Sequence, residues 1–323
     1  MAAVPLPAPV VPARQGPRAR VLRRLGLVLG LLVAAFPSAV SAEDRPLRLV
    51  TFNVLHGGPW SGITGNDRHL ERRLTMIVEG LRALDPDVVA LQESAITRRH
   101  GDVAGRIAQA LGLHHVHARA TERVFPLNLL GRLIVGVLGF VEGPAILSRF
   151  PITGTEVYDL PRCRRRLDPR VVLRADLDTP AGALSVFSTH TSRDDCQTRR
   201  VAELAREHQG AAPAVVMGDL NTGEAAPGLA GFRDQGFVDV FRAANPTAPG
   251  LTVWQRIEEP VPTVFRRVDY VFLRAGEEVA ASALSGRLVL DTPQPAEDGG
   301  MLWPSDHYGV FVEVGLLRRT SAR

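Results

Sequence analysis

The chain has 323 residues, of which 45% are hydrophobic and only 6% aromatic. This length and composition allow one large folded domain or two small ones, and they exclude disorder as the state of most of the chain. The formal net charge is +4, but residues 1–42 hold five arginines and no acid, so residues 43–323 carry a formal charge of −1. The high isoelectric point is therefore weak evidence for nucleic-acid binding.

Residues 1–42 have the layout of a secretory signal. Arginines up to Arg24 are followed by the apolar stretch LGLVLGLLVAAF and then by small residues that end at Ala42. We expect cleavage after Ala42 and export to the periplasm or the medium, with residues 43–323 as a single catalytic domain. The apolar stretch is short for a membrane span, and an uncleaved anchor is the alternative.

Strands and helices are expected in a mixed order. The first strand is predicted at 47–55, followed by a helix in which Leu70, Leu74 and Ile77 recur at helical spacing. A strand at 87–93 and a helix at about 101–111 come next. Four strands are then expected in quick succession, at 143–152, 153–160, 170–178 and 183–190. A helix at 198–209 and three more strands follow, at 214–220, 266–274 and 307–317. Strands thus occur both between helices and in helix-free runs, which predicts a mixed α/β architecture with more than one sheet.

Polar residues able to bind a metal ion or a phosphate recur at the ends of these apolar strands. Each has an ordinary structural explanation, such as a turn for Asp219 and Asn221. Together they are costly to bury without a shared task, because buried charges persist when they are paired or bound to a metal. The set consists of Asn53, Glu93, His190, Asp219, Asn221, Asp269, Asp306 and His307.

The segments around these residues resemble a known family. TFNVLHGG, DVVALQE, GPAILSRFPI, STH, GDLNT, VDYVF and SDHYGV are similar, in this order, to the motifs of the endonuclease/exonuclease/phosphatase superfamily of Mg²⁺-dependent phosphoesterases. The resemblance covers roughly residues 46–316. It implies a four-layer α/β/β/α sandwich of two mixed sheets flanked by helices, with the active site where the strand-end loops of the two sheets meet.

The resemblance also implies roles for the polar residues. Glu93, Asn53 and Asp306 would serve a Mg²⁺ site, with Mn²⁺ or Ca²⁺ as substitutes. Asp219 would deprotonate the attacking water. Phosphate contacts would come from Asn221, His190 and His307, the last held by Asp269.

The substrate is left open by the motifs. The apolar insertion 124–142 could lie beside the site as core, or residues 124–141 could dip into a membrane interface. Cys163 and Cys196 resemble the disulfide of bacterial sphingomyelinases, and together these features favour a phospholipid phosphodiesterase of the sphingomyelinase or phospholipase C type.

Against a lipid substrate, PRCRRRLDPR carries five arginines near the expected site and could hold a DNA backbone. A secreted deoxyribonuclease-like enzyme is therefore the alternative, and a non-catalytic phosphoester-binding module is a further one. Arg149 and Arg170 are expected to contact the substrate. No protein partner is inferred.

Overall fold

The computed structural model describes residues 45–56, 67–123, 133, 136–163, 168–253, 256–296 and 299–319. These residues belong to one compact unit, Val40–Arg323. The expected leader, residues 1–42, lies outside the described residues. Within the described residues, no helix has both the length and the apolar character needed to cross a bilayer.

Two mixed sheets form the centre of the unit. The first sheet has the order β12-β15-β1-β2-β5-β4, with β3 paired to β2, and the second has the order β10-β11-β9-β8-β7-β6. The strands of the first sheet are β1 (Leu47–Asn53), β2 (Val88–Thr97), β3 (Gly101–Asp102), β4 (His114–His117), β5 (Phe140–Ser148), β12 (Val279–Val289) and β15 (Gly309–Arg318). Those of the second are β6 (Ile152–Asp159), β7 (Val171–Thr179), β8 (Gly182–His190), β9 (Ala214–Asp219), β10 (Val238–Asp239) and β11 (Asp269–Arg274). A separate pair is formed by β13 (Gln294–Pro295) and β14 (Met301–Leu302).

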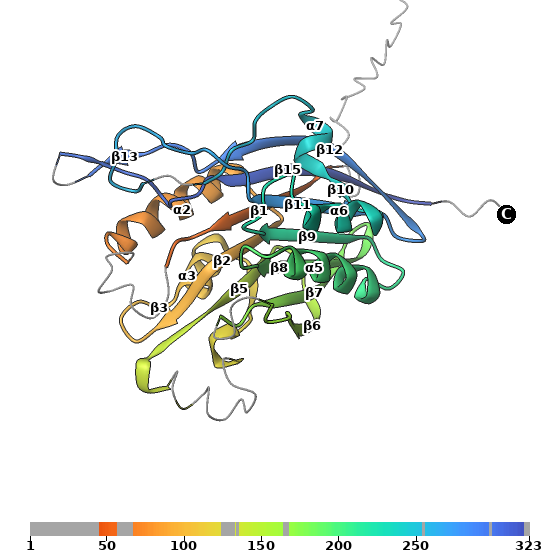
Figure 1. Ribbon diagram of the computed structural model, residues 1–323, viewed down its shortest axis with the longest axis horizontal. Helices are drawn as coiled ribbons and strands as arrows, with labels where there is room; N and C mark the ends of the chain where they lie inside the picture. The colour runs from red at the N-terminus through yellow and green to blue at the C-terminus, as the bar shows by residue number, and fades with distance from the viewer. Residues whose placement is uncertain are drawn as a thin grey trace, which may run out of the picture. The chain divides into compact units, whose positions relative to one another are not determined.

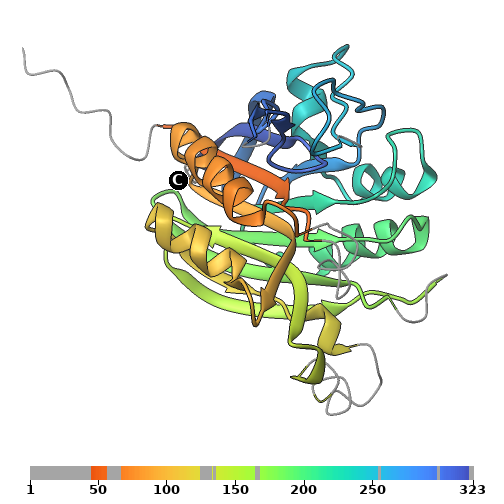
Figure 2. The ribbon, with the colours of Figure 1, turned by 90° about the vertical axis from the view of Figure 1, so that its left-hand side faces the viewer.

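Helices cover the outer faces of both sheets. Figure 2 shows α2 (Leu70–Leu84) and α3 (Val103–Leu111) side by side on the first sheet, and α5 (Asp195–His208) and α6 (Pro227–Asp234) on the second. A short α7 (Val240–Ala244) packs beside β12, and η1 (Ala120–Arg123) beside β5 (Figure 1). This is the expected α/β/β/α sandwich.

The apolar pattern of the strands explains this layering. Along β1, Leu49 packs in the cluster between the two sheets, whereas Val50 and Phe52 pack in the cluster under α2 and α3. On β9, Val215 and Met217 likewise face the inter-sheet cluster, while other apolar residues of the second sheet pack under α5. Because successive side chains of a strand point to opposite faces, strands that are apolar at every position are buried on both sides.

Strand direction brings the motif residues to one edge. The pairs β1–β2 and β8–β9 are parallel, so all four strands end on the same side of their sheets. β11 runs antiparallel to β9, and β15 antiparallel to β1, so these two strands begin where the others end. The loops at this edge carry the candidate site.

Candidate active site

The centre of the site is a contact between the two sheets. The carboxamide of Asn53, at the end of β1, donates to Glu93 Oε1 at 3.1 Å and to Asp219 Oδ2 at 3.2 Å. Its oxygen accepts from the backbone N–H of Leu55 at 2.9 Å. Asn53 therefore links the carboxylate of the first sheet to the carboxylate of the second. Asn53 and Asp219 end their strands, whereas Glu93, predicted to end a strand at 87–93, lies within β2, which continues to Thr97.

The backbone at Glu93 departs from regular strand geometry. Glu93 has φ of 52°, and the register between β2 and β5 shifts between Leu91 and Ser94. A non-glycine residue in the left-handed region costs on the order of 1–3 kcal/mol and persists where the surroundings enforce it. The irregularity leaves Glu93 out of the β2–β5 pairing, and this places its side chain at the strand-end loops.

A carboxylate of the second sheet and an imidazole from the loop before β15 of the first sheet form a fixed pair. His307 donates from Nδ1 to Asp269 Oδ2 at 2.9 Å, and its Nε2 lies 3.7 Å from Asp219 Oδ2. Burial alone would lower the pKa of His307, but the charges of Asp269, Asp219 and Asp306 raise that pKa well above its usual value. The ring is thus an imidazolium held in one orientation, with Nε2 facing the site.

Asp219 is buried at the meeting point of these groups. Burial raises the pKa of its carboxyl from 3.8 to about 7, with His307 opposing the rise and Asp269 adding to it. Its Oδ1 accepts from the backbone N–H of Asn221 at 2.8 Å. A carboxylate that is oriented by backbone and side-chain donors, with a pKa near neutrality, suits a general base.

Asn221 and His190 form the second polar pair of this sheet. Asn221 has φ of 49°, which is a conformation that asparagine tolerates better than most residues. Its carboxamide donates to His190 Nε2 at 3.0 Å and to the Thr191 carbonyl at 3.0 Å. Burial, with the charges of Arg170 and His307, lowers the pKa of His190 well below its usual value, so this ring is neutral. In this structure Asn221 therefore orients His190. The direct contact of Asn221 with phosphate stays a prediction.

Asp306 and Arg73 complete the first sheet's side of the site. Burial raises the pKa of Asp306 to about 6, with His307 opposing this and Glu93 adding to it. The fully buried Arg73 of α2 donates to the carbonyls of Val54 and Leu55, directly after Asn53, and to that of Pro304, just before Asp306. One guanidinium thus fastens the two loops that carry Asn53 and Asp306.

Arg73 is a site residue that the motifs do not indicate. Its signal in the sequence is an arginine between Leu70 and Leu74, on the apolar stripe of α2. Charged residues are almost never fully buried unless they are paired, so an arginine on such a stripe indicates a structural task.

The oxygen donors fit a divalent cation. Glu93 and Asp306 repel each other, with the neutral amide of Asn53 beside Glu93. Asp219, Asp269 and His307 form a further buried group whose ligand atoms lie within 4.8 Å of one another. Carboxylate and amide oxygens in an incomplete protein cage are what Mg²⁺ prefers, because it retains several waters.

The two arginines expected to contact substrate have different positions. Arg170 lies beside the site, where its guanidinium pairs with Asp168 at 2.9 Å and a small pocket is lined by both of them, Glu93 and His190. Arg149 is at the opposite edge, because β5 runs antiparallel to β2 and Arg149 follows its far end. There Arg149 pairs with Asp85 and Asp87. The expectation that Arg149 contacts substrate is therefore wrong.

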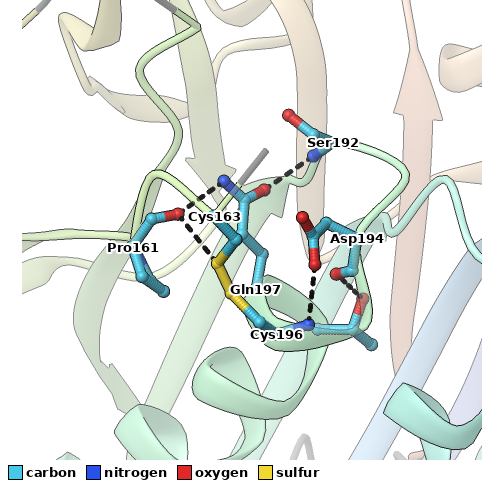
Figure 3. Close-up of a disulfide and its surroundings, with 7 residues drawn as sticks. Pro161, Cys163, Ser192, Asp194, Cys196 and Gln197 are labelled. Carbon is cyan, nitrogen blue, oxygen red and sulfur yellow. Dashed lines mark hydrogen bonds between the residues drawn. A yellow bond between two sulfur atoms is a disulfide. The ribbon is translucent and has the colours of Figure 1, made fainter. Parts of the chain in front are cut away.

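The two cysteines are joined in a disulfide between the loop after β6 and the first turn of α5 (Figure 3). In the same figure Gln197 donates to the Pro161 carbonyl at 2.9 Å and accepts from the backbone N–H of Ser192 at 2.8 Å. These contacts fix Ser192, two residues beyond His190, against the loop that leads to Arg170. Residues 164–167 and most of the apolar insertion, 124–132 and 134–135, lie outside the described residues.

The sandwich carries a polar site between its two sheets, at the edge where β1 and β9 end. The model of the Endonuclease/Exonuclease/phosphatase family matches residues 50–307, and the chain belongs to this family. Endonucleases, exonucleases and phosphatases all cleave phosphoric esters, so membership supports a hydrolase of such esters.

Solved structures show the same fold at low identity. An endonuclease/exonuclease/phosphatase from Beutenbergia cavernae is 23% identical, with a TM-score of 0.59 over 84% of this chain and 72% of that one. The mannosyl-6-phosphatase Bt3783 of Bacteroides thetaiotaomicron is 18% identical, with a TM-score of 0.61 over 83% and 99%. TDP2 of D. rerio, complexed with a single-strand DNA product, is 18% identical, with a TM-score of 0.59 over 84% and 99%. The search of curated proteins gave no match.

Proposed function

We propose that the protein is a Mg²⁺-dependent phosphodiester hydrolase in which Asp219 activates the attacking water. The observation that carries this proposal is the position of Asp219, buried between Asn53, Asn221 and His307, with its pKa raised to about 7. Glu93 and Asp306, with Asn53, would hold the cation. When bound, the ion supplies positive charge to the phosphoryl oxygens.

Each polar residue of the site then has its own role in the in-line hydrolysis. The Asp219 carboxylate accepts the proton of the water, and Asn53 and the Asn221 backbone keep it oriented. The His307 imidazolium donates from Nε2 to the charge that develops on the phosphoryl group, while Asp269 holds the ring. His190, oriented by Asn221, contributes a second polar contact for the phosphate.

Hydrolysis of bis(p-nitrophenyl) phosphate by the purified full chain tests this function. We expect turnover that requires Mg²⁺, and a Glu93→Gln variant whose Mg²⁺ midpoint rises, because a neutral amide is a poorer ligand for a hard dication. Glu79→Gln, on the exposed face of α2, is the matched control. An unchanged Mg²⁺ midpoint in Glu93→Gln would place the cation elsewhere.

For the substrate we propose a phospholipid at a membrane surface, reached by an exported protein. Three apolar side chains of the insertion are exposed, Leu133 at 65%, Val137 at 71% and Leu138 at 49%. Clustered exposed apolar residues favour an interaction surface over core. A deoxyribonuclease-like activity is the second candidate, supported by Arg170 beside the site.

Turnover of sphingomyelin and phosphatidylcholine vesicles, compared with plasmid DNA, tests the substrate proposal. We expect Val137→Ser/Leu138→Ser to reduce vesicle binding and lipid turnover while hydrolysis of the soluble diester is retained. Leu284→Ser/Leu317→Ser, which removes exposed apolar residues of the β12–β15 pair, is the control. DNA cleavage without lipid turnover would favour the nuclease instead.

A further inference from the structure

A groove lies beside the site on the side of Asn221. It has a volume of about 320 Å³ and is lined by Asn221, Thr222, Gly223, Arg193 and Arg266, together with the first residues of α5. Because Asn221 borders the groove and also contacts His190, the groove adjoins the candidate active site.

Arg266 lacks a partner in this groove. Its Nε and Nη2 atoms are buried and make no hydrogen bond to any residue that the structure describes. The next residue, Arg267, differs, since it donates to Glu224 at 2.6 Å and to Asp239 at 2.7 Å, and only its Nε lacks a partner among the described residues. Buried polar atoms almost always have partners, and leaving such an atom without a hydrogen bond costs free energy. The contrast marks Arg266 as a group that awaits a ligand.

The backbone holds Arg266 firmly next to the catalytic groups. Arg266 pairs with Val253 through N–H to carbonyl bonds, and Val253 also forms a β-bridge with His307. The Arg266 backbone is thus linked through one residue to the backbone of His307.

Two arginines and two aspartates line the groove, and the two guanidinium groups are its cationic donors. Burial and the neighbouring Arg193 lower the pKa of Arg266, and the carboxylate that opposes this is Asp219. The two acids of the groove each accept one backbone N–H, Asp194 from Cys196 at 3.1 Å and Asp195 from Gly228 at 3.1 Å, and Asp194 Oδ2 is buried without a partner among the described residues. A guanidinium presents its N–H groups as a fork that matches phosphate oxygens.

We propose that Arg266, assisted by Arg193, forms a subsite for a second phosphate group of the substrate, next to the phosphate that is hydrolysed. The inference rests on the proposed phosphodiesterase function and narrows its substrate class. The cleaved phosphate must lie beside His307 and the water that Asp219 activates, and the groove begins beyond Asn221. Its occupant is therefore an adjoining group, and substrates with two phosphates are preferred over substrates with one. Among phospholipids, this favours phosphorylated headgroups over zwitterionic ones.

Two soluble probes that differ by one phosphate test the subsite. Thymidine 5′-(p-nitrophenyl phosphate) is compared with its 3′-phosphorylated form, with p-nitrophenol release as the signal. For the wild type we expect kcat/KM to be roughly tenfold or more higher for the 3′-phosphorylated probe, which is the range for one charge-assisted contact. Arg266→Met should bring this ratio close to one, Arg266→Lys should retain part of it, and Arg200→Met, on the outer face of α5, should leave it intact.

Binding of thymidine 3′,5′-bisphosphate, measured by calorimetry, decides the inference independently of turnover. Affinity should fall roughly tenfold in Arg266→Met and remain unchanged in Arg200→Met. Equal kcat/KM for the two probes in the wild type, or equal affinity in wild type and Arg266→Met, would overturn the subsite. If the wild type hydrolysed neither of the two probes, the proposed function would be overturned. The calorimetric comparison would still show whether Arg266 binds the second phosphate.

Discussion

Gly218 sets the distance between β8 and β9, and its replacement by alanine tests how far the site depends on that distance. Gly218 is paired with Thr189 in the parallel ladder, one residue before the pair formed by His190 and Asp219. A Cβ atom on Gly218 would lie 2.1 Å from the Thr189 carbonyl oxygen and 3.0 Å from its carbonyl carbon. Both are backbone atoms, so no side chain can move aside.

The expected effect follows from that distance. To reach a tolerable contact of about 3 Å, the two strands must separate by roughly 1 Å, at an overpacking cost of about 1–3 kcal/mol. For a domain of this size, that lowers the unfolding temperature by about 2–4 °C per kcal/mol. A displacement of about 1 Å between groups that must act together can reduce turnover by about 100-fold. Gly218→Ala should therefore lose far more activity than its loss of stability explains.

Gly223→Ala is the matched control for this prediction. No heavy atom lies within 4 Å of a Cβ at Gly223, and its backbone has no positive φ. We expect wild-type unfolding temperature and turnover of bis(p-nitrophenyl) phosphate for this variant. Wild-type turnover in Gly218→Ala, at an unchanged unfolding temperature, would refute the idea that the close approach of the strands positions the site.

Three further variants probe the site and its support. Asp219→Asn should lower turnover by about two orders of magnitude or more. Because burial raises the pKa of Asp219 to about 7 from 3.8, its ionisation opposes folding. The metal-free variant should therefore melt above the wild type at pH 8, by a margin that shrinks towards pH 4; equal melting curves at pH 8 would contradict this. Arg73→Lys should lower stability by about 2–4 kcal/mol in thermal unfolding and raise the Mg²⁺ midpoint, because an ammonium cannot bind every carbonyl held by the guanidinium; an unmoved Mg²⁺ midpoint would limit Arg73 to a structural role. Cys163→Ser/Cys196→Ser should cost about 2–4 kcal/mol in denaturant unfolding, and equal midpoints for wild type and variant would show that the bond adds no stability.

The sequence predicts the central strands of the two sheets well because these strands are apolar at nearly every position. β9 is buried throughout, and its pattern allows only a strand in the core. β12 is not predicted, since Ser282, Leu284 and Gly286 mix polar, exposed and small residues on an edge strand. Its eleven residues are held by pairing with β15, which is a contact that no local pattern reveals.

The site residues are predictable by type and not by contact. The motifs indicate Asn53 and Asp219, but the 3.2 Å bond between them joins residues 166 positions apart and depends on how the sheets stack. Arg149 shows the converse. Its motif lies in the family pattern, yet the antiparallel direction of β5 carries it to the far edge. Sheet stacking decides the first outcome and strand direction the second, and single-sequence patterns encode neither.

The division of the site between the sheets has a consequence for stability and activity. The first sheet supplies Glu93 and the loops of Asn53 and Asp306, and the second supplies Asp219 and Asp269. Two side chains cross between them, Asn53 to Asp219 and His307 to Asp269. The relative position of the sheets is set by the apolar layer they share, where Leu49 and Met217 pack in one cluster. Interiors of this density transmit small displacements, so a substitution in this layer changes the spacing of catalytic groups that it does not touch. Activity should therefore be more sensitive to the packing between the sheets than to the packing under the outer helices. A shift of an outer helix does not change the spacing of the two sheets, so it leaves both hydrogen bonds that cross between them in place.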